Sequence, residues 1–201
     1  MATMTLIIQI LAVSTYIPFI WAVRTIFRQV GDEQPRPFAI AKYYSALCML
    51  SFLYGINRNE DLGKITAIFC IILFLYSHLA FWWAIKTVKR QRLSLAFSED
   101  SPEELIVQGP YRWVRHPFYS AYVSSYLASA LAAGFNPYGI LFVGLLGFYI
   151  WSALYEENKF AKSSLRPAYE RYCARTGRFT PFPTLLSLVS TRPNKEGNHG
   201  L

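Results

Sequence analysis

The sequence predicts an all-α, polytopic integral membrane protein with about five transmembrane helices and a cytosolic C-terminal amphipathic helix. Of its 201 residues, 53% are hydrophobic and only 16% are charged, a composition too apolar for an ordinary soluble domain. Five apolar runs approach the ~20 residues that a helix needs to cross a bilayer. The basic residues collect in alternate connections between these runs, which is typical of a membrane protein with a fixed orientation.

The apolar runs give the expected helices in chain order. They are residues 6–23, 38–56, 65–85, 118–134 and 137–155. The second run is the weakest because it carries Lys42, whose ammonium must reach the interface. The very short connection before Pro137 predicts that the last two runs form an antiparallel hairpin. Small residues recur every three or four positions in the fourth run and predict a face for close helix contact: Ala121, Ser125, Ala128 and Ala132.

The distribution of positive charge predicts the orientation. With the N-terminus outside, every Lys and Arg except Arg58 and Lys64 falls in or beside a cytosolic segment. The C-terminus and the candidate site are then cytosolic. This topology accounts for the formal net charge of +8, so we expect membrane lipids as partners and no nucleic acid.

Three regions are expected along the chain. Residues 1–85 hold the first three transmembrane helices, residues 86–183 form a catalytic, cofactor-binding region, and residues 184–201 form a flexible tail. His78, inside the third run, is expected to be a hydrogen-bonded packing residue. The three cysteines have no paired spacing, so neither a disulfide framework nor a metal site is predicted.

Polar residues cluster immediately before the fourth run. Residues 109–119 contain two arginines, a histidine and two tyrosines, and Pro117 suits the first turn of a helix. The acidic pair Glu156-Glu157 closes the fifth run, and the short hairpin should bring these two ends together. The spacing alone leaves two interpretations open. The residues form a cytosolic pocket, or the arginines anchor the topology while the glutamates mark where the helix leaves lipid.

The motifs resemble a known family of membrane enzymes. In order they are Gly109-x-Tyr111-x3-Arg115-His116-Pro117-x-Tyr119, Glu156-Glu157, Tyr169-x2-Tyr172 and Thr176-Gly177-Arg178-Phe179-x-Pro181. Over residues 93–183 the chain resembles the isoprenylcysteine carboxyl methyltransferases, integral membrane enzymes that use S-adenosylmethionine. Residues 154–157 also resemble the related phosphatidylethanolamine N-methyltransferases.

The resemblance implies a cofactor and a set of contacts to it. The positions that match the family's S-adenosylmethionine contacts are Glu103, Glu104, Leu105, Ile106, Tyr111, His116, Pro117, Phe118, Tyr119 and Glu157. A carboxylate such as Glu157 can pair with the cofactor's ammonium, and aromatic rings can pack on its sulfonium. The candidate catalytic residues are Arg115, His116 and Glu156. No glycine-rich nucleotide loop is present, which argues against a soluble Rossmann-type methyltransferase.

The expected reaction is methyl transfer to a lipophilic substrate that reaches the site from the bilayer, a prenylcysteine-type carboxylate or similar. The sequence departs from the eukaryotic members at Ala153, where they carry an arginine. An amine acceptor must lose a proton, and Glu156, His116 or Tyr119 would then be the candidate base. The alternatives are a phospholipid amine N-methyltransferase, an NADPH-dependent membrane reductase with a related Arg-His-Pro pattern, and a non-enzymatic membrane protein.

Overall fold

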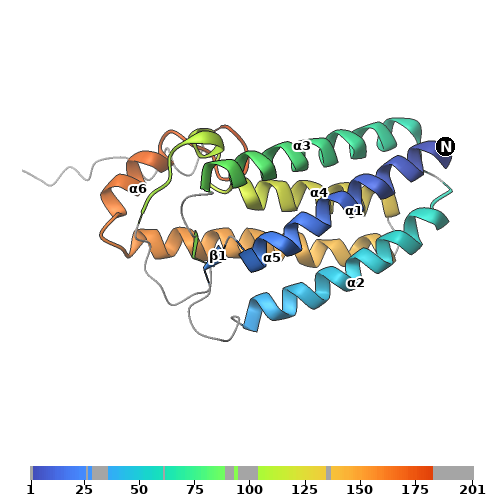
Figure 1. The fold of residues 1–201 in the computed structure, drawn as a ribbon, viewed down its shortest axis with the longest axis horizontal. Coiled ribbons are helices and arrows are strands. Elements are labelled where there is room, and N and C mark those ends of the chain that lie inside the picture. The colour runs from blue at the N-terminus through green and yellow to red at the C-terminus, as the bar shows by residue number, and fades with distance from the viewer. Residues whose placement is uncertain are drawn as a thin grey trace, which may run out of the picture.

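The chain folds into a bundle of long helices, with a short helix at one end of the bundle (Figure 1). In this computed structural model, the described residues are 2–25, 27–28, 36–60, 62–88, 93–94, 104–134 and 137–182. Helices dominate this part of the chain, which confirms the all-α class. The expected tail at 184–201 and the candidate site residue Glu103 lie outside the described residues.

The long helices follow the predicted apolar runs closely. In chain order the elements are α1 (Ala2–Thr25), β1 (Phe27–Arg28), α2 (Arg36–Arg58), α3 (Lys64–Val88), β2 (Leu93–Ser94), η1 (Gly109–Arg112), α4 (Pro117–Ala133), α5 (Pro137–Ala161) and α6 (Arg166–Cys173). The strands β1 and β2 pair in parallel. The sequence did not predict this pair, because two residues are too few to show a period.

Helix α4 lies at the centre of the bundle and packs against α3 and α5. Its predicted contact face is confirmed, since Ala121, Ser125, Ala128 and Ala132 are all fully buried. Small side chains let the backbones approach closely. The Ser77 hydroxyl of α3 therefore reaches α4 and donates a hydrogen bond to the main-chain oxygen of Ala121 at 2.8 Å.

The predicted antiparallel hairpin of α4 and α5 is also present. His116, immediately before α4, contacts Glu157 near the end of α5. At the opposite end of the hairpin, Gly139 lies against the main-chain oxygen of Gly134. The start of α4 and the end of α5 therefore meet at one end of the bundle, and α6 lies at that same end (Figure 1).

Three helices among the described residues are long and apolar enough to cross a membrane. They are α1 over Ala2–Ala22, α3 over Lys64–Val88 and α5 over Pro137–Ala161. Helix α4 is shorter, with 17 residues, and α2 carries Lys42 among several polar side chains. Large apolar side chains cover the outer faces of the bundle, among them Leu6, Ile10, Ile17, Leu47, Leu50, Ile72, Leu79, Ile140 and Val143. An outer surface of this kind suits lipid rather than water.

His78 joins α3 to α1 by hydrogen bonds. Its Nδ1 lies 3.0 Å from the Thr15 hydroxyl and 3.1 Å from the main-chain oxygen of Phe74, and its Nε2 lies 3.2 Å from the Ser14 hydroxyl. The expectation of a hydrogen-bonded packing histidine is therefore confirmed. These contacts fix α1 against α3 inside an otherwise apolar interface.

Candidate active site

The turn before α4 depends on a glycine. Gly109 opens η1 with φ 58°, in the left-handed region, and a Cβ there would overlap the side chain of Thr87. The turn buries Tyr111, and the Tyr172 hydroxyl of α6 donates a hydrogen bond to the Tyr111 main-chain oxygen at 2.6 Å. Burial raises the pKa of both phenols, so each remains a neutral hydroxyl at physiological pH.

The main chain that leads into α4 is held by the segment that follows α6. The Arg115 N–H donates to the Gly177 oxygen at 2.8 Å, and the His116 N–H donates to the Arg178 oxygen at 3.2 Å. A Cβ at Gly177 would overlap main-chain oxygens of the turn that follows it, so this close approach needs glycine. Two motifs about 60 residues apart in the chain are thereby fixed side by side.

Glu157 is the hub of a buried charge cluster. Its Oε1 accepts hydrogen bonds from Arg115 Nε at 3.1 Å, His116 Nε2 at 3.1 Å and Arg178 Nε at 2.9 Å. Its Oε2 accepts a further bond from Arg178 Nη2 at 2.7 Å, so Arg178 binds the carboxylate through two nitrogens. The Arg115 side chain is only 4% exposed and that of Glu157 only 14%. The protein's own donors therefore occupy both oxygens of Glu157.

Arg115 is fixed from a second side by main-chain oxygens. Its Nη1 donates to the Thr176 oxygen at 2.7 Å and to the Cys173 oxygen at 3.3 Å. Hydrogen bonds to Glu157 raise the pKa of the Arg178 guanidinium, which keeps it charged. Both arginines are thus committed to holding the C-terminal segment against α4 and α5.

Glu156 stands beside this cluster and is more exposed than Glu157. Its side chain is 34% exposed, and its Oε2 lies 3.8 Å from His116 Nδ1, beyond hydrogen-bond length. The Tyr119 hydroxyl lies beside it. The rings of His116 and Tyr119 stack, with centroids 5.4 Å apart and planes at 15°. Glu156 is therefore the carboxylate of the pair that can still accept hydrogen bonds from a bound molecule.

The tautomer of His116 gives this position a distinct electrostatic character. Because a carboxylate only accepts hydrogen bonds, Nε2 carries the hydrogen that points to Glu157. In the neutral imidazole, Nδ1 then presents a lone pair toward Glu156. With the ring in that neutral form, two acceptors face one another across 3.8 Å, and an ammonium N–H between them would stabilise the arrangement.

The structure brings most of the predicted site residues to this end of the bundle. The candidate catalytic residues Arg115, His116 and Glu156 lie in one cluster with Glu157, and Tyr119 contacts it. The acidic pair therefore does more than mark where α5 leaves lipid.

Four of the other predicted cofactor contacts have different surroundings. Pro117 is the first residue of α4, as expected for a proline at a helix start. Phe118 packs against Phe81 in the apolar core, with ring centroids 5.7 Å apart. Glu104 is exposed, whereas Ile106 packs against the core.

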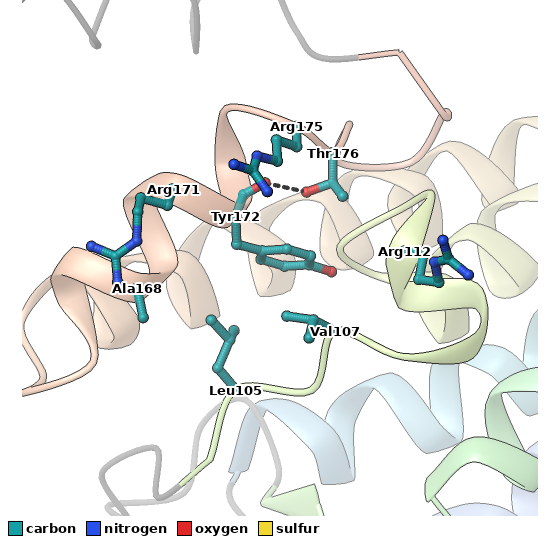
Figure 2. Close-up of a pocket in the computed structure, with 8 residues that line it drawn as sticks. All are labelled: Leu105, Val107, Arg112, Ala168, Arg171, Tyr172, Arg175 and Thr176. Carbon is teal, nitrogen blue, oxygen red and sulfur yellow. Dashed lines mark hydrogen bonds between the residues drawn. The ribbon is translucent and has the colours of Figure 1, made fainter.

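A cavity of about 650 Å³ lies between the segment before η1 and the last turns of α6 (Figure 2). We call it the arginine pocket. Its lining residues are Leu105, Val107, Arg112, Ala168, Arg171, Tyr172, Arg175 and Thr176. Of the predicted cofactor contacts, Leu105 lies in this wall, and no residue of the cluster around Glu157 does.

Arg178 was not among the predicted catalytic or cofactor-binding residues, although its motif suggested that it could close the pocket. It belongs to the C-terminal motif, and that motif was the only signal that could have identified it. Ala153 lies one helical turn before Glu157 and is fully buried, so a longer side chain there would displace its neighbours. Within the described residues, no group of three or more His, Cys, Asp or Glu is arranged to hold a metal ion.

Comparison with known proteins adds one match. A family model described as phospholipid methyltransferase matches residues 65–166, just over half of the 201 residues. The matched segment runs from the start of α3 through α4 and α5 to the first residue of α6, and so includes Arg115, His116, Glu156 and Glu157, whereas Arg178 lies beyond it. No curated protein and no solved structure matches the chain.

Proposed function

The chain belongs to the phospholipid methyltransferase family, and from this premise we propose that it transfers a methyl group from S-adenosylmethionine to an amine-bearing lipid at the membrane surface. The family makes the chain a membrane methyltransferase. Beyond what the family match gives, we propose the identity of the cofactor and the chemical class of the methyl acceptor. The observation that carries the proposal is the partly exposed Glu156 carboxylate beside Glu157, whose two oxygens are already hydrogen-bonded to the protein.

The chemistry of the cluster fits the cofactor. S-adenosylmethionine, when bound, supplies an electrophilic methyl group on a positively charged sulfonium. The stacked rings of His116 and Tyr119 offer aromatic faces to this cation. Tyr111 and the main chain of residues 104–106 would form the remaining contacts. Glu157 supports this site by fixing His116, because its own oxygens are already bonded.

The charges around Glu156 favour an amine acceptor over a carboxylate. The positive charges of Arg115 and Arg178 are directed to Glu157, so neither is free to bind an incoming carboxylate. Glu156 would repel a carboxylate and attract an ammonium. Position 153 is alanine, so the chain also lacks an arginine there that would favour a carboxylate acceptor. These points support an amine in place of the prenylcysteine-type acceptor expected from the sequence.

Each residue then has a defined task. Glu156 takes the proton that the ammonium must lose before its nitrogen becomes a nucleophile. Tyr119 and His116 orient Glu156 and line the path of the methyl group. The apolar helices exclude water and hold the two reactants in line, which is the main requirement of a displacement at carbon. The carbon–sulfur bond breaks as the carbon–nitrogen bond forms, and the proton leaves on Glu156.

The test uses the purified full chain in lipid vesicles with methyl-labelled S-adenosylmethionine. Vesicles contain either an ethanolamine phospholipid or a prenylcysteine analogue. We expect label in the ethanolamine lipid that survives mild base, because N-methyl bonds are stable to base and methyl esters are not. Base-labile label in the prenylcysteine analogue would overturn the amine proposal. Turnover that requires NADPH and no S-adenosylmethionine would overturn methyl transfer itself.

Substituting each glutamate in turn distinguishes a catalytic role of Glu156 from a structural role of Glu157. Glu156→Gln should lower kcat by about 10²–10⁴-fold, the usual contribution of a general base, while thermal stability stays close to that of the parent. Glu157→Gln should instead reduce stability, because it leaves buried arginine charge without its partner. Equal losses of activity and stability in both variants would contradict this division of roles.

We also propose the complete topology of five spans, with the N-terminus outside and the active site cytosolic. Lys64 opens α3 and Arg58 closes α2 at the end of the bundle away from the cluster, whereas arginines gather at the cluster end. This asymmetry is the one that the positive-inside rule requires. Tags at the two termini should show opposite accessibility in sealed vesicles. Tags accessible from the same side would contradict the odd number of spans.

A further inference from the structure

The arginine pocket carries positive charge that nothing in the described structure neutralises. Arg112, Arg171 and Arg175 line it, and all three are exposed. Among the described residues none of the three makes an ion pair, whereas Arg115 and Arg178 pair with Glu157 and Arg166 pairs with Glu170. One arginine of α6, one just after α6 and one of the turn before α4 therefore border one cavity.

The centre of this pocket is apolar. The three guanidinium groups stand around its rim, and Leu105, Val107 and the ring of Tyr172 lie between them (Figure 2). The Tyr172 hydroxyl is already bonded to the Tyr111 main-chain oxygen, so mainly its ring is offered to a ligand. An apolar centre with a cationic rim is complementary to an amphiphile that carries an anionic group.

The arginine pocket lies beside the cluster that serves methyl transfer and has a different charge. S-adenosylmethionine carries a sulfonium and an ammonium against one carboxylate, so three unpaired guanidinium groups disfavour it. No residue around Glu157 lines the pocket. The two regions meet at Thr176, which lines the pocket and whose main-chain oxygen binds Arg115, and at Leu105, whose side chain lines the pocket while the main chain of residues 104–106 is assigned to the cofactor.

We propose that the arginine pocket binds the phosphate headgroup of an anionic membrane phospholipid that is not the methyl acceptor. Guanidinium groups bind phosphate oxygens through paired hydrogen bonds, and the apolar centre takes the glycerol and first acyl carbons. The pocket lies at the end of the bundle where α6 and the cluster meet, the end that faces the membrane surface in the proposed topology. This assignment goes beyond methyl transfer and does not depend on the class of acceptor.

The test measures lipid-dependent thermal stabilisation of the full chain in detergent. Phosphatidylglycerol and phosphatidylcholine with the same acyl chains are titrated separately, and the rise in melting temperature gives an apparent affinity. Glycerol 3-phosphate is the third arm and represents a free anion. We expect phosphatidylglycerol to bind at least about tenfold more tightly than either other molecule.

Two matched variants distinguish lipid binding at this pocket from nonspecific attraction of the lipid to a positively charged protein. The variant Arg112→Gln, Arg171→Gln, Arg175→Gln removes the rim. The control Lys86→Gln, Lys162→Gln, Arg166→Gln removes the same amount of charge from exposed positions outside the pocket. We expect the rim variant to lose the preference for phosphatidylglycerol and the control to keep it within about threefold.

Three results would overturn the proposal: an unchanged preference in the rim variant, an equal loss in both variants, or glycerol 3-phosphate binding as tightly as the lipid. The single change Arg171→Gln provides a second test if the triple variant unfolds, because Arg171 is exposed and makes no ion pair in the described structure. It should weaken phosphatidylglycerol binding measurably on its own. Parent-like binding by this folded variant would count against the pocket.

Discussion

Replacing Glu157 with glutamine tests whether the charge cluster holds this end of the bundle together. The substitution keeps the shape of the side chain and removes its charge. Arg115, only 4% exposed, would then remain buried without its anionic partner. Breaking a buried ion pair in this way costs about 3–5 kcal/mol, and the partial exposure of Arg178 favours the lower end. A loss of about 3 kcal/mol corresponds to a fall in melting temperature of roughly 6–12 °C for a chain of this length.

The measurement is thermal unfolding in detergent, followed by tryptophan fluorescence. The five tryptophans supply the signal. Glu170→Gln is the matched control, because the same substitution there removes an ion pair whose two side chains are 64% and 59% exposed. Solvent screens such a pair, so we expect no measurable change.

A double-mutant cycle with Arg178→Gln makes the reasoning specific to the hub. Because Arg178 binds both oxygens of Glu157, the two substitutions should be non-additive by about 1 kcal/mol or more. If Glu157→Gln melted within about 2 °C of the Glu170→Gln control, the cluster would not be a buried structural element and the assignment of Glu157 would fail.

The remaining predictions concern the C-terminal segment. Gly177→Ala should destabilise the protein by about 1–3 kcal/mol, because the new Cβ meets main-chain oxygens that cannot move without breaking the turn; a parent-like melting temperature would refute this. Tyr172→Phe should cost about 1–3 kcal/mol by leaving the Tyr111 main-chain oxygen without its donor, with Tyr169→Phe, whose hydroxyl donates to no main-chain oxygen of the described residues, as the control. Burial raises the pKa of the Cys173 thiol. At pH 8 the folded protein should therefore react with maleimide more slowly than the chain unfolded in guanidinium chloride. This difference in rate should narrow at higher pH, where the folded thiol ionises. Equal rates at pH 8, after subtraction of the Cys173→Ser background, would contradict that pKa.

The buried face of α4 shows why much of the fold was predictable. Small residues at helical spacing, as at Ala121 and Ser125, leave a periodic pattern that can be read without knowing the neighbouring helix. Pro117 likewise marks the start of its helix through local backbone chemistry alone. The parallel pair of β1 and β2 left no such pattern, because it is two residues long and joins segments far apart in the chain.

The residues that form the site could be predicted from the sequence, but the role of each residue could not. The short hairpin required the residues before α4 to meet Glu156 and Glu157, and the structure brings them together. Which glutamate is bonded to the protein and which is open to a ligand depends on the side to which each carboxylate points. Adjacent residues on a helix differ by about 100° in direction, and no sequence pattern states what lies on either side.

The sequence by itself therefore determined an apolar helical bundle, the hairpin and the gathering of polar residues at one end, because these follow from periodicity, chain connectivity and the distribution of charge. Only the tertiary structure decided that Arg178 joins Arg115 and His116 on Glu157, leaving Glu156 open, and that three other arginines border a separate pocket. Ion pairing depends on distances of a few ångströms between segments remote in sequence, and those distances exist only once α6 and the segment after it are placed against α4 and α5.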